Sequence, residues 1–148
     1  MKNAGTPKAE NMTKSRRNSQ VDDAVDPRLA RQGALSYLEI PALDTRRSAV
    51  FYEKVLGWLP RGEDGEQSKF SDPDGHLIGR WVTGRAVWRE PGLLPFIYVN
   101  HIHTALEAVT ANGGGIVKAV CPEGTLLVAV VRDPAGNIIG LWQGNNRR

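Results

Sequence analysis

The chain has 148 residues, of which 41% are hydrophobic and 24% charged, with a net charge of +3. This length suits one domain or two small modules with a common core, and the composition is that of an ordinary soluble globular protein. No apolar run approaches the roughly 18 residues of a membrane span, and the N-terminus lacks the apolar region of a signal peptide. The single cysteine, Cys121, cannot form an internal disulfide. We therefore expect a cytoplasmic protein without a membrane partner.

Residues 1–33 carry the excess of positive charge, because they hold 7 of the 19 Lys and Arg residues and only 4 of the 16 acids. They show almost no apolar periodicity, so they cannot bury enough surface to offset the entropy of ordering. The basic cluster at residues 14–17 is too short to predict nucleic-acid binding. We predict a disordered basic tail over 1–33 and a folded domain over 34–148.

The first half of the domain, about residues 34–84, predicts the order β-α-β-β-β. Residues 35–40 are compatible with a strand that Pro41 ends, and Asp44 is a suitable N-cap for a helix over 45–56 that Gly57 ends. Short strands are then predicted at residues 58–59, 69–70 and 76–82.

The second half, about residues 94–144, predicts the same order after a connector over 84–94. Residues 95–100 read as a strand, and a helix is predicted from about residue 103 to 111, where Gly113-Gly114-Gly115 stops it. Three further strands are predicted over 116–120, 126–131 and 137–142.

Two similar turns relate these halves to each other. Asp72-Pro73-Asp74-Gly75 and Asp133-Pro134-Ala135-Gly136 lie 61 residues apart, and each precedes a largely apolar run that ends in Trp. Pro presets the backbone of such a turn, and the Asp side chain can accept hydrogen bonds from it. Tyr98 also lies 61 residues after Tyr37, which indicates an internal duplication.

The duplicated chain resembles the vicinal oxygen chelate superfamily, which groups glyoxalase I-like enzymes, extradiol dioxygenases and bleomycin-resistance-type binding proteins. The resemblance covers residues 34–144 and rests on the segments 37–41, 44 with 51–52, 55–58, 133–137 and 141–143. It implies an α+β fold in which two βαβββ modules form an incompletely closed eight-stranded barrel around a cleft. It also implies a homodimer, since members of this superfamily often pair.

The same resemblance implies metal-ligand positions in both modules, at Tyr37, Gly79, Tyr98 and Gly140. None of these residues is a ligand of the expected type, and the two glycines have no side-chain donor. A divalent ion needs about four to six oxygen or nitrogen donors. We therefore predict neither a metal nor another cofactor.

If the ligand positions face the cleft, the alternation of side chains along a strand places six residues in it. These are Tyr37, Glu39, Trp81, Tyr98, Asn100 and Trp142. Aromatic walls with one carboxylate and one amide are typical of a small-molecule pocket, and the two glycines would widen its floor. The alternative is that these aromatic side chains simply fill a small barrel.

Glu39 is the candidate catalytic residue. A carboxylate among aromatic side chains would have its charged form disfavoured, which raises its pKa toward the range useful for proton transfer. The alternative is an ion pair with Arg80 or another basic residue. We predict a protein that binds a small aromatic or amphipathic organic ligand without a metal, either as a sequestering module or as a lyase or isomerase that uses Glu39. The alternative function is a metal-dependent glyoxalase- or dioxygenase-like enzyme.

Overall fold

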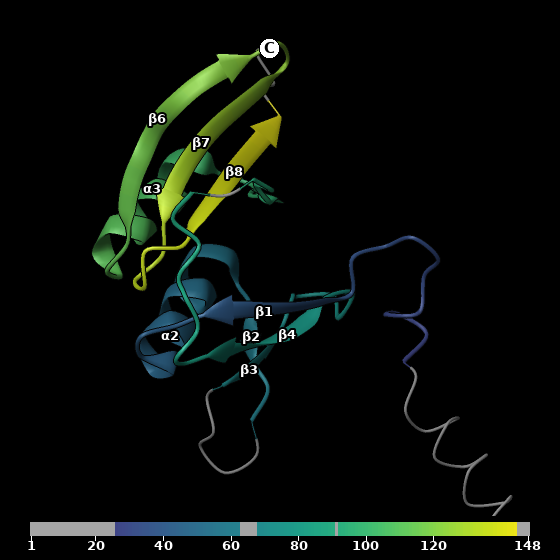
Figure 1. Cartoon of the computed structure of the whole chain (residues 1–148). Helices are drawn as coiled ribbons and strands as arrows, with labels where there is room; N and C mark the ends of the chain where they lie inside the picture. Colours follow the sequence, from purple (N-terminus) through teal and green to yellow (C-terminus); the bar gives the residue numbers. More distant parts are fainter. Residues whose placement is uncertain (1–25, 63–67, 91, 145–148) are drawn as a thin grey trace, which may run out of the picture.

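The computed structural model describes residues 26–62, 68–90 and 92–144 (Figure 1). It confirms the β-α-β-β-β order of both halves. The first module contains β1 (Tyr37–Pro41), α2 (Thr45–Leu56), β2 (Leu59–Pro60), β3 (Lys69–Ser71) and β4 (Ile78–Val82). The second contains β5 (Phe96–Tyr98), α3 (Ile102–Ala111), β6 (Gly115–Glu123), β7 (Leu126–Arg132) and β8 (Ile138–Gly144). Residues 1–25 of the predicted tail lie outside the described residues, whereas residues 26–33 form hydrogen-bonded turns.

Local sequence signals set the ends of both helices. Asp44 caps α2 by accepting hydrogen bonds from the backbone N–H groups of Arg46 and Arg47, and Gly57 ends it in the left-handed conformation at φ 72°. At the start of α3, the N–H of Ile102 instead donates to Oε1 of Gln143, 2.7 Å away in β8. Neither helix is long and apolar enough to cross a membrane.

Each module has one four-stranded sheet, in the order β1-β4-β3-β2 and β5-β8-β7-β6. The first and last strands of each module are parallel, and the other neighbours are antiparallel. The two sheets do not close on each other. In Figure 1, α2 lies on the side of the first sheet that faces the second module, where it contacts α3.

The two modules differ in strand register despite their duplicated sequences. Tyr98 lies opposite Trp142, whereas Tyr37 lies opposite Ile78 rather than opposite Trp81. A displacement by three residues is odd, so it reverses the face on which every later side chain lies. As a result Trp81 enters the core beside Ile40, and Arg80 faces solvent.

Aromatic rings fill the core of the first module. Trp58 stacks between Tyr52 and Phe70 at centroid distances of 5.0 and 4.7 Å, and Trp81 lies 4.7 Å from Phe70. All four residues are at most 4% exposed. Burial of Trp81 is far more favourable than burial of the Arg80 guanidinium, which gives a physical reason for the register of β4.

The second Asp-Pro turn joins the two modules through Asp133. One carboxylate oxygen of Asp133 accepts the backbone N–H groups of residues 135–137 at 2.9–3.0 Å. The other accepts the Tyr52 hydroxyl of α2 at 2.9 Å and Nδ2 of Asn137 at 2.7 Å. In the first turn, by contrast, the Asp72 side chain accepts one backbone N–H, from His76.

Asn137 extends this network to the first module and the connector. Its Nδ2 also donates to the carbonyl oxygen of Pro41 at 2.6 Å, and its Oδ1 accepts the N–H of Trp88 at 2.8 Å. Both Asp133 and Asn137 are 2% exposed. The network therefore holds the end of β1, helix α2 and the start of β8 in fixed relation.

Candidate functional site

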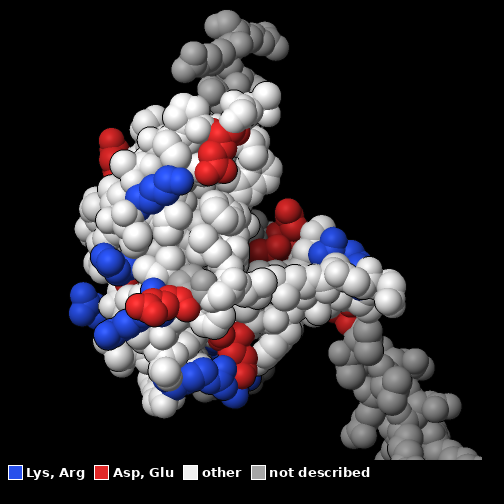
Figure 2. Space-filling view, turned by 45° about the horizontal axis from the view of Figure 1, so that its top comes forward, with Lys and Arg blue, Asp and Glu red and all other residues white. Residues whose placement is uncertain are grey.

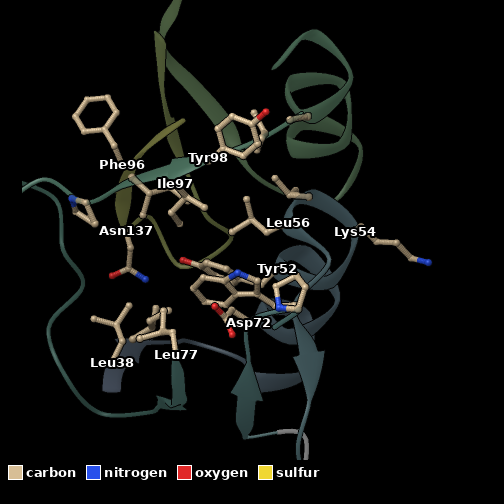
Figure 3. Close-up of a pocket in the computed structure, with 18 of the residues that line it drawn as sticks. Leu38, Tyr52, Lys54, Leu56, Asp72, Leu77, Phe96, Ile97, Tyr98 and Asn137 are labelled. Atoms are coloured by element: carbon tan, nitrogen blue, oxygen red, sulfur yellow. The ribbon is translucent and has the colours of Figure 1, made fainter. Parts of the chain in front are cut away.

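A cavity of about 940 Å³ lies between the two modules (Figure 3). It lies along the edge strands β1 and β5 and is also bordered by residues of α2 and α3. Its apolar lining comes from both modules and includes Leu38, Val55, Leu56, Leu77, Leu93, Phe96, Ile97 and Val99. Figure 3 shows Leu38 and Leu77 on one side of the space, with Phe96 and Ile97 across from them.

The hydrophobic walls are side chains that the core only partly covers. Leu38, Leu56, Leu77 and Ile97 pack against the core with one side and are half-buried. They therefore present apolar surface to the cavity, where a ligand could remove it from water.

The polar groups of the cavity fall into two kinds. Tyr52 and Asn137 line it, but their side chains are committed to the network around Asp133. Asn100 and Thr104 also line it, are exposed, and form no side-chain hydrogen bond with the described part of the chain. These two side chains are free to orient a ligand by hydrogen bonding.

The Tyr52–Asp133 contact sets the ionisation of this part of the site. Burial raises the pKa of the Asp133 carboxyl, although the hydrogen bonds from Asn137 and Tyr52 oppose that shift. Burial beside Asp133 also raises the pKa of the Tyr52 hydroxyl well above its usual value. Tyr52 is therefore neutral at pH 7 and acts as a hydrogen-bond donor.

Glu39 lies on the edge strand β1, so it borders the cavity while its carboxylate is turned toward two guanidinium groups. Arg80 Nε donates to Oε2 at 2.7 Å and Arg85 Nη2 to Oε1 at 3.0 Å, while the Tyr37 hydroxyl donates to Oε2 at 3.2 Å. The hydrogen bond from Arg80, followed by that from Arg85, lowers the pKa of Glu39. The expectation of a raised pKa is wrong, and the alternative of an ion pair with Arg80 is confirmed.

The six predicted site residues do not form one cluster. Glu39, Tyr98 and Asn100 line the inter-module cavity. Tyr37 borders a smaller cavity on the outer face of the first sheet, and Trp142 packs edge-to-face on Tyr98 at 4.9 Å.

Trp81 does not line a cleft, contrary to our expectation. It is 3% exposed and lies on the opposite face of the first sheet from Tyr37 and Glu39, because of the register of β4. The alternative that aromatic side chains fill the interior holds for this residue.

The two glycines do not widen a cleft floor. A Cβ at Gly140 would collide with the ring of Phe96, and a Cβ at Gly79 would collide with the carbonyl oxygen of Leu38 and with the ring of Phe70. Both glycines are therefore needed so that the chain's own groups can pack closely. The expectation that they let a ligand approach the backbone is wrong.

Within residues 26–62, 68–90 and 92–144, no group of three or more His, Cys, Asp or Glu side chains could hold a metal ion. The lack of a metal or other cofactor in the working protein stays a prediction.

Sequence reasoning missed the hydrophobic walls of the cavity. The alternation of side chains that puts Tyr37 and Tyr98 on one face of their strands puts Leu38, Ile97 and Val99 on the other, where they pack against or within the core. The cavity arises because the second module lies beside this face. That arrangement depends on contacts such as Tyr52 to Asp133, 81 residues apart, for which the local pattern carries no signal.

No model of a protein family and no curated protein matches the sequence. Solved structures do match the fold. A glyoxalase/bleomycin resistance protein from Albidiferax ferrireducens T118 is 21% identical with a TM-score of 0.59, covering 73% of this chain and 96% of that one. A glyoxalase family protein from Bacillus cereus is 17% identical with a TM-score of 0.62, covering 77% and 95%. The fosfomycin resistance protein FosX from Mesorhizobium loti is 12% identical with a TM-score of 0.59, covering 77% and 93%. The chain therefore has the fold of glyoxalase/bleomycin resistance proteins, and the predicted resemblance to the vicinal oxygen chelate superfamily is confirmed at the level of the fold.

Proposed function

We propose that the protein binds a small, mainly apolar organic molecule in the cavity between its two modules. The observation that carries this proposal is the cavity itself, about 940 Å³ in volume and lined by half-buried apolar side chains from both modules. Ligand pockets in proteins typically have about 300–1,000 Å³ and a few polar groups among hydrophobic walls. Asn100 and Thr104 would supply those polar groups here.

The gain from burying a ligand in this cavity is large enough for useful affinity. A molecule that buries about 300 Å² of its own apolar surface and covers a similar area of the cavity walls gains roughly 15 kcal/mol from the hydrophobic effect, before the loss of its translational and rotational freedom. Hydrogen bonds to Asn100 or Thr104 would contribute mainly orientation. We therefore expect binding in the micromolar range for an aromatic or amphipathic ligand, and weaker binding for small polar metabolites.

The state of Glu39 favours a binding or sequestering role over acid-base catalysis. Its carboxylate is ionised and held by Arg80 and Arg85, so it is a poor proton donor near neutral pH. Two of the structures that share the fold are described as a glyoxalase/bleomycin resistance protein and a fosfomycin resistance protein. A sequestering role would place this chain with the proteins of this fold that are named for resistance.

A thermal-shift screen of aromatic and amphipathic small molecules, with and without divalent ions, is the first test. A ligand that stabilises the protein equally in both conditions supports the proposal. Stabilisation that requires a divalent ion would instead support the metal-dependent enzyme.

A matched pair of variants in α3 then locates the ligand. Thr104→Trp places a bulky side chain in the cavity, whereas Thr110→Trp makes the same change at another exposed position of α3 that does not line the cavity. We expect Thr104→Trp to weaken binding at least tenfold in isothermal titration calorimetry and Thr110→Trp to leave it unchanged. Equal affinity of both variants would contradict the assignment of the site.

A further inference from the structure

The outer face of the first sheet, turned away from α2, carries a second cavity of about 320 Å³. Its lining includes three cationic side chains, Arg61, Lys69 and Arg80, together with Tyr37 and Ile78. We call Arg61, Lys69 and Arg80 the basic cluster. The face is exposed to solvent, since Arg61, Lys69 and Arg80 are all exposed and Tyr37 is 50% exposed.

Strand pairing brings the basic cluster together. Lys69 of β3 lies directly opposite Arg80 of β4 in the antiparallel register, so both side chains lie on the same face. The backbone N–H of Arg61 donates to the carbonyl oxygen of Lys69 at 2.7 Å, which holds Arg61 next to Lys69. The sheet therefore fixes the backbone positions from which all three cations extend.

Within the described residues, the charge of this face is only partly compensated. Like charges directly opposite each other destabilise a sheet, and the described residues that line this cavity include no carboxylate. Glu39 is a counter-ion of Arg80, but Arg85 shares it, and the Asp26 carboxylate lies close enough to Arg61 to interact with it electrostatically. Arg61 and Lys69 form no ion pair within the described part of the chain.

Basic residues are also distributed unevenly between the two modules. Residues 37–90 contain eight Lys and Arg residues, and residues 92–144 contain two. In the view of Figure 2, the surface of the second module is accordingly mostly white. Most basic side chains of the domain therefore belong to the module that carries the basic cluster, although nine acidic residues balance them over residues 37–90.

We propose that the basic cluster binds a compact tetrahedral oxyanion, the phosphate or sulfate group of a small molecule. The Arg80 guanidinium can offer two parallel N–H donors to such a group, Lys69 supplies a point charge, and Arg61 closes the opposite flank. The Tyr37 ring and Ile78 offer apolar contact for the organic part of the ligand. This site is separate from the inter-module cavity, so it does not depend on the function proposed above.

Glu39 has an unusual role under this proposal. Its carboxylate occupies the Arg80 Nε donor at 2.7 Å, so it competes with an incoming anion for the same group. Removal of its charge should therefore strengthen anion binding. If Glu39 instead contacted the ligand as a catalytic or recognition group, the same substitution would weaken binding.

Titration calorimetry of the full chain at low ionic strength tests the proposal, with inorganic phosphate, inorganic sulfate and phenyl phosphate as probes. We expect Lys69→Gln to weaken binding of phenyl phosphate roughly threefold to tenfold, through loss of one charge-assisted contact. Glu39→Gln should strengthen it about threefold. Arg46→Gln is the matched control, because it removes one exposed positive charge from α2, away from the cluster. The phosphate and sulfate arms distinguish which oxyanion the site prefers.

Several results would overturn the proposal. These are equal weakening by Lys69→Gln and Arg46→Gln, weaker binding by Glu39→Gln, or no binding of any probe. Binding of duplex DNA with no binding of the small probes would also overturn it, since that result would identify an extended polyanion surface. Retention of the wild-type melting temperature by Lys69→Gln shows that the variant is folded.

Discussion

Replacement of Tyr52 by Phe removes one hydroxyl from the network that joins the two modules. The hydroxyl donates to Oδ2 of Asp133 at 2.9 Å, and both residues are at most 2% exposed. A hydrogen bond to a charged group contributes about 1.5–3 kcal/mol, and the loss is largest where water cannot replace the donor. Asp133 keeps the donation from Asn137 Nδ2, which limits the penalty. We therefore expect Tyr52→Phe to lower the free energy of unfolding by about 2 kcal/mol at pH 7.

Urea unfolding at pH 7 measures this loss, and Tyr37→Phe is the control. Tyr37 also donates its hydroxyl to a carboxylate, Glu39, but it is 50% exposed, so water can replace it. We expect the control to change the free energy of unfolding by less than about 0.5 kcal/mol. A loss below about 0.5 kcal/mol for Tyr52→Phe as well would refute the argument that this contact holds the modules together.

The pH dependence gives a second check on the same network. Burial raises the pKa of Asp133, so the folded state binds this proton more readily than the unfolded state. This group's contribution to stability is therefore fully present below the unfolded pKa and is lost as the pH rises through the folded pKa. The Tyr52 hydrogen bond lowers that pKa, so the destabilisation by Tyr52→Phe should shrink as the pH falls through this window. A difference between wild type and variant that does not vary with pH would contradict the role of Asp133.

Three other predictions concern the core and the turns. Asn137→Ala should lower the free energy of unfolding by about 2–4 kcal/mol in urea titrations, because three side-chain hydrogen bonds are lost. His76→Ala, at the exposed position of the first module that is equivalent to Asn137, should have little effect. Trp81→Ala should lower it by about 3–5 kcal/mol, and a loss under 1 kcal/mol would place this ring outside the core. Gly140→Ala should lower the melting temperature, because the new methyl group collides with the Phe96 ring. Adding Phe96→Ala to this variant should restore part of the melting temperature, and additive effects of the two substitutions would contradict the contact.

The secondary structure could be predicted because its signals are local. Asp44 and Gly57 mark the two ends of α2, and the Asp-Pro turns mark the starts of β4 and β8. The duplication then implied the fold. Strand ends were less accurate: β6 continues through Pro122, which is tolerated because β6 is an edge strand.

The candidate site was predicted less well because it depends on register and on the docking of the modules. The duplication placed Trp81 and Trp142 in equivalent positions, but Trp81 is buried and Trp142 is half-buried beside Tyr98. A choice between burial of a Trp ring and burial of an Arg guanidinium decided the register of β4, and a repeat pattern does not weigh such a choice. The pairing of Glu39 with Arg80 could be foreseen only as an alternative, since the residues lie 41 positions apart.

Two-dimensional ¹H–¹⁵N spectra of the labelled protein, titrated with a hit from the thermal-shift screen, test the inter-module cavity most directly. We expect the largest shifts at the backbone amides of Leu38, Leu56 and Ile97, which come from three different elements and all line the cavity. Shifts confined to β6 and β7, whose residues lie outside the lining, would contradict this expectation.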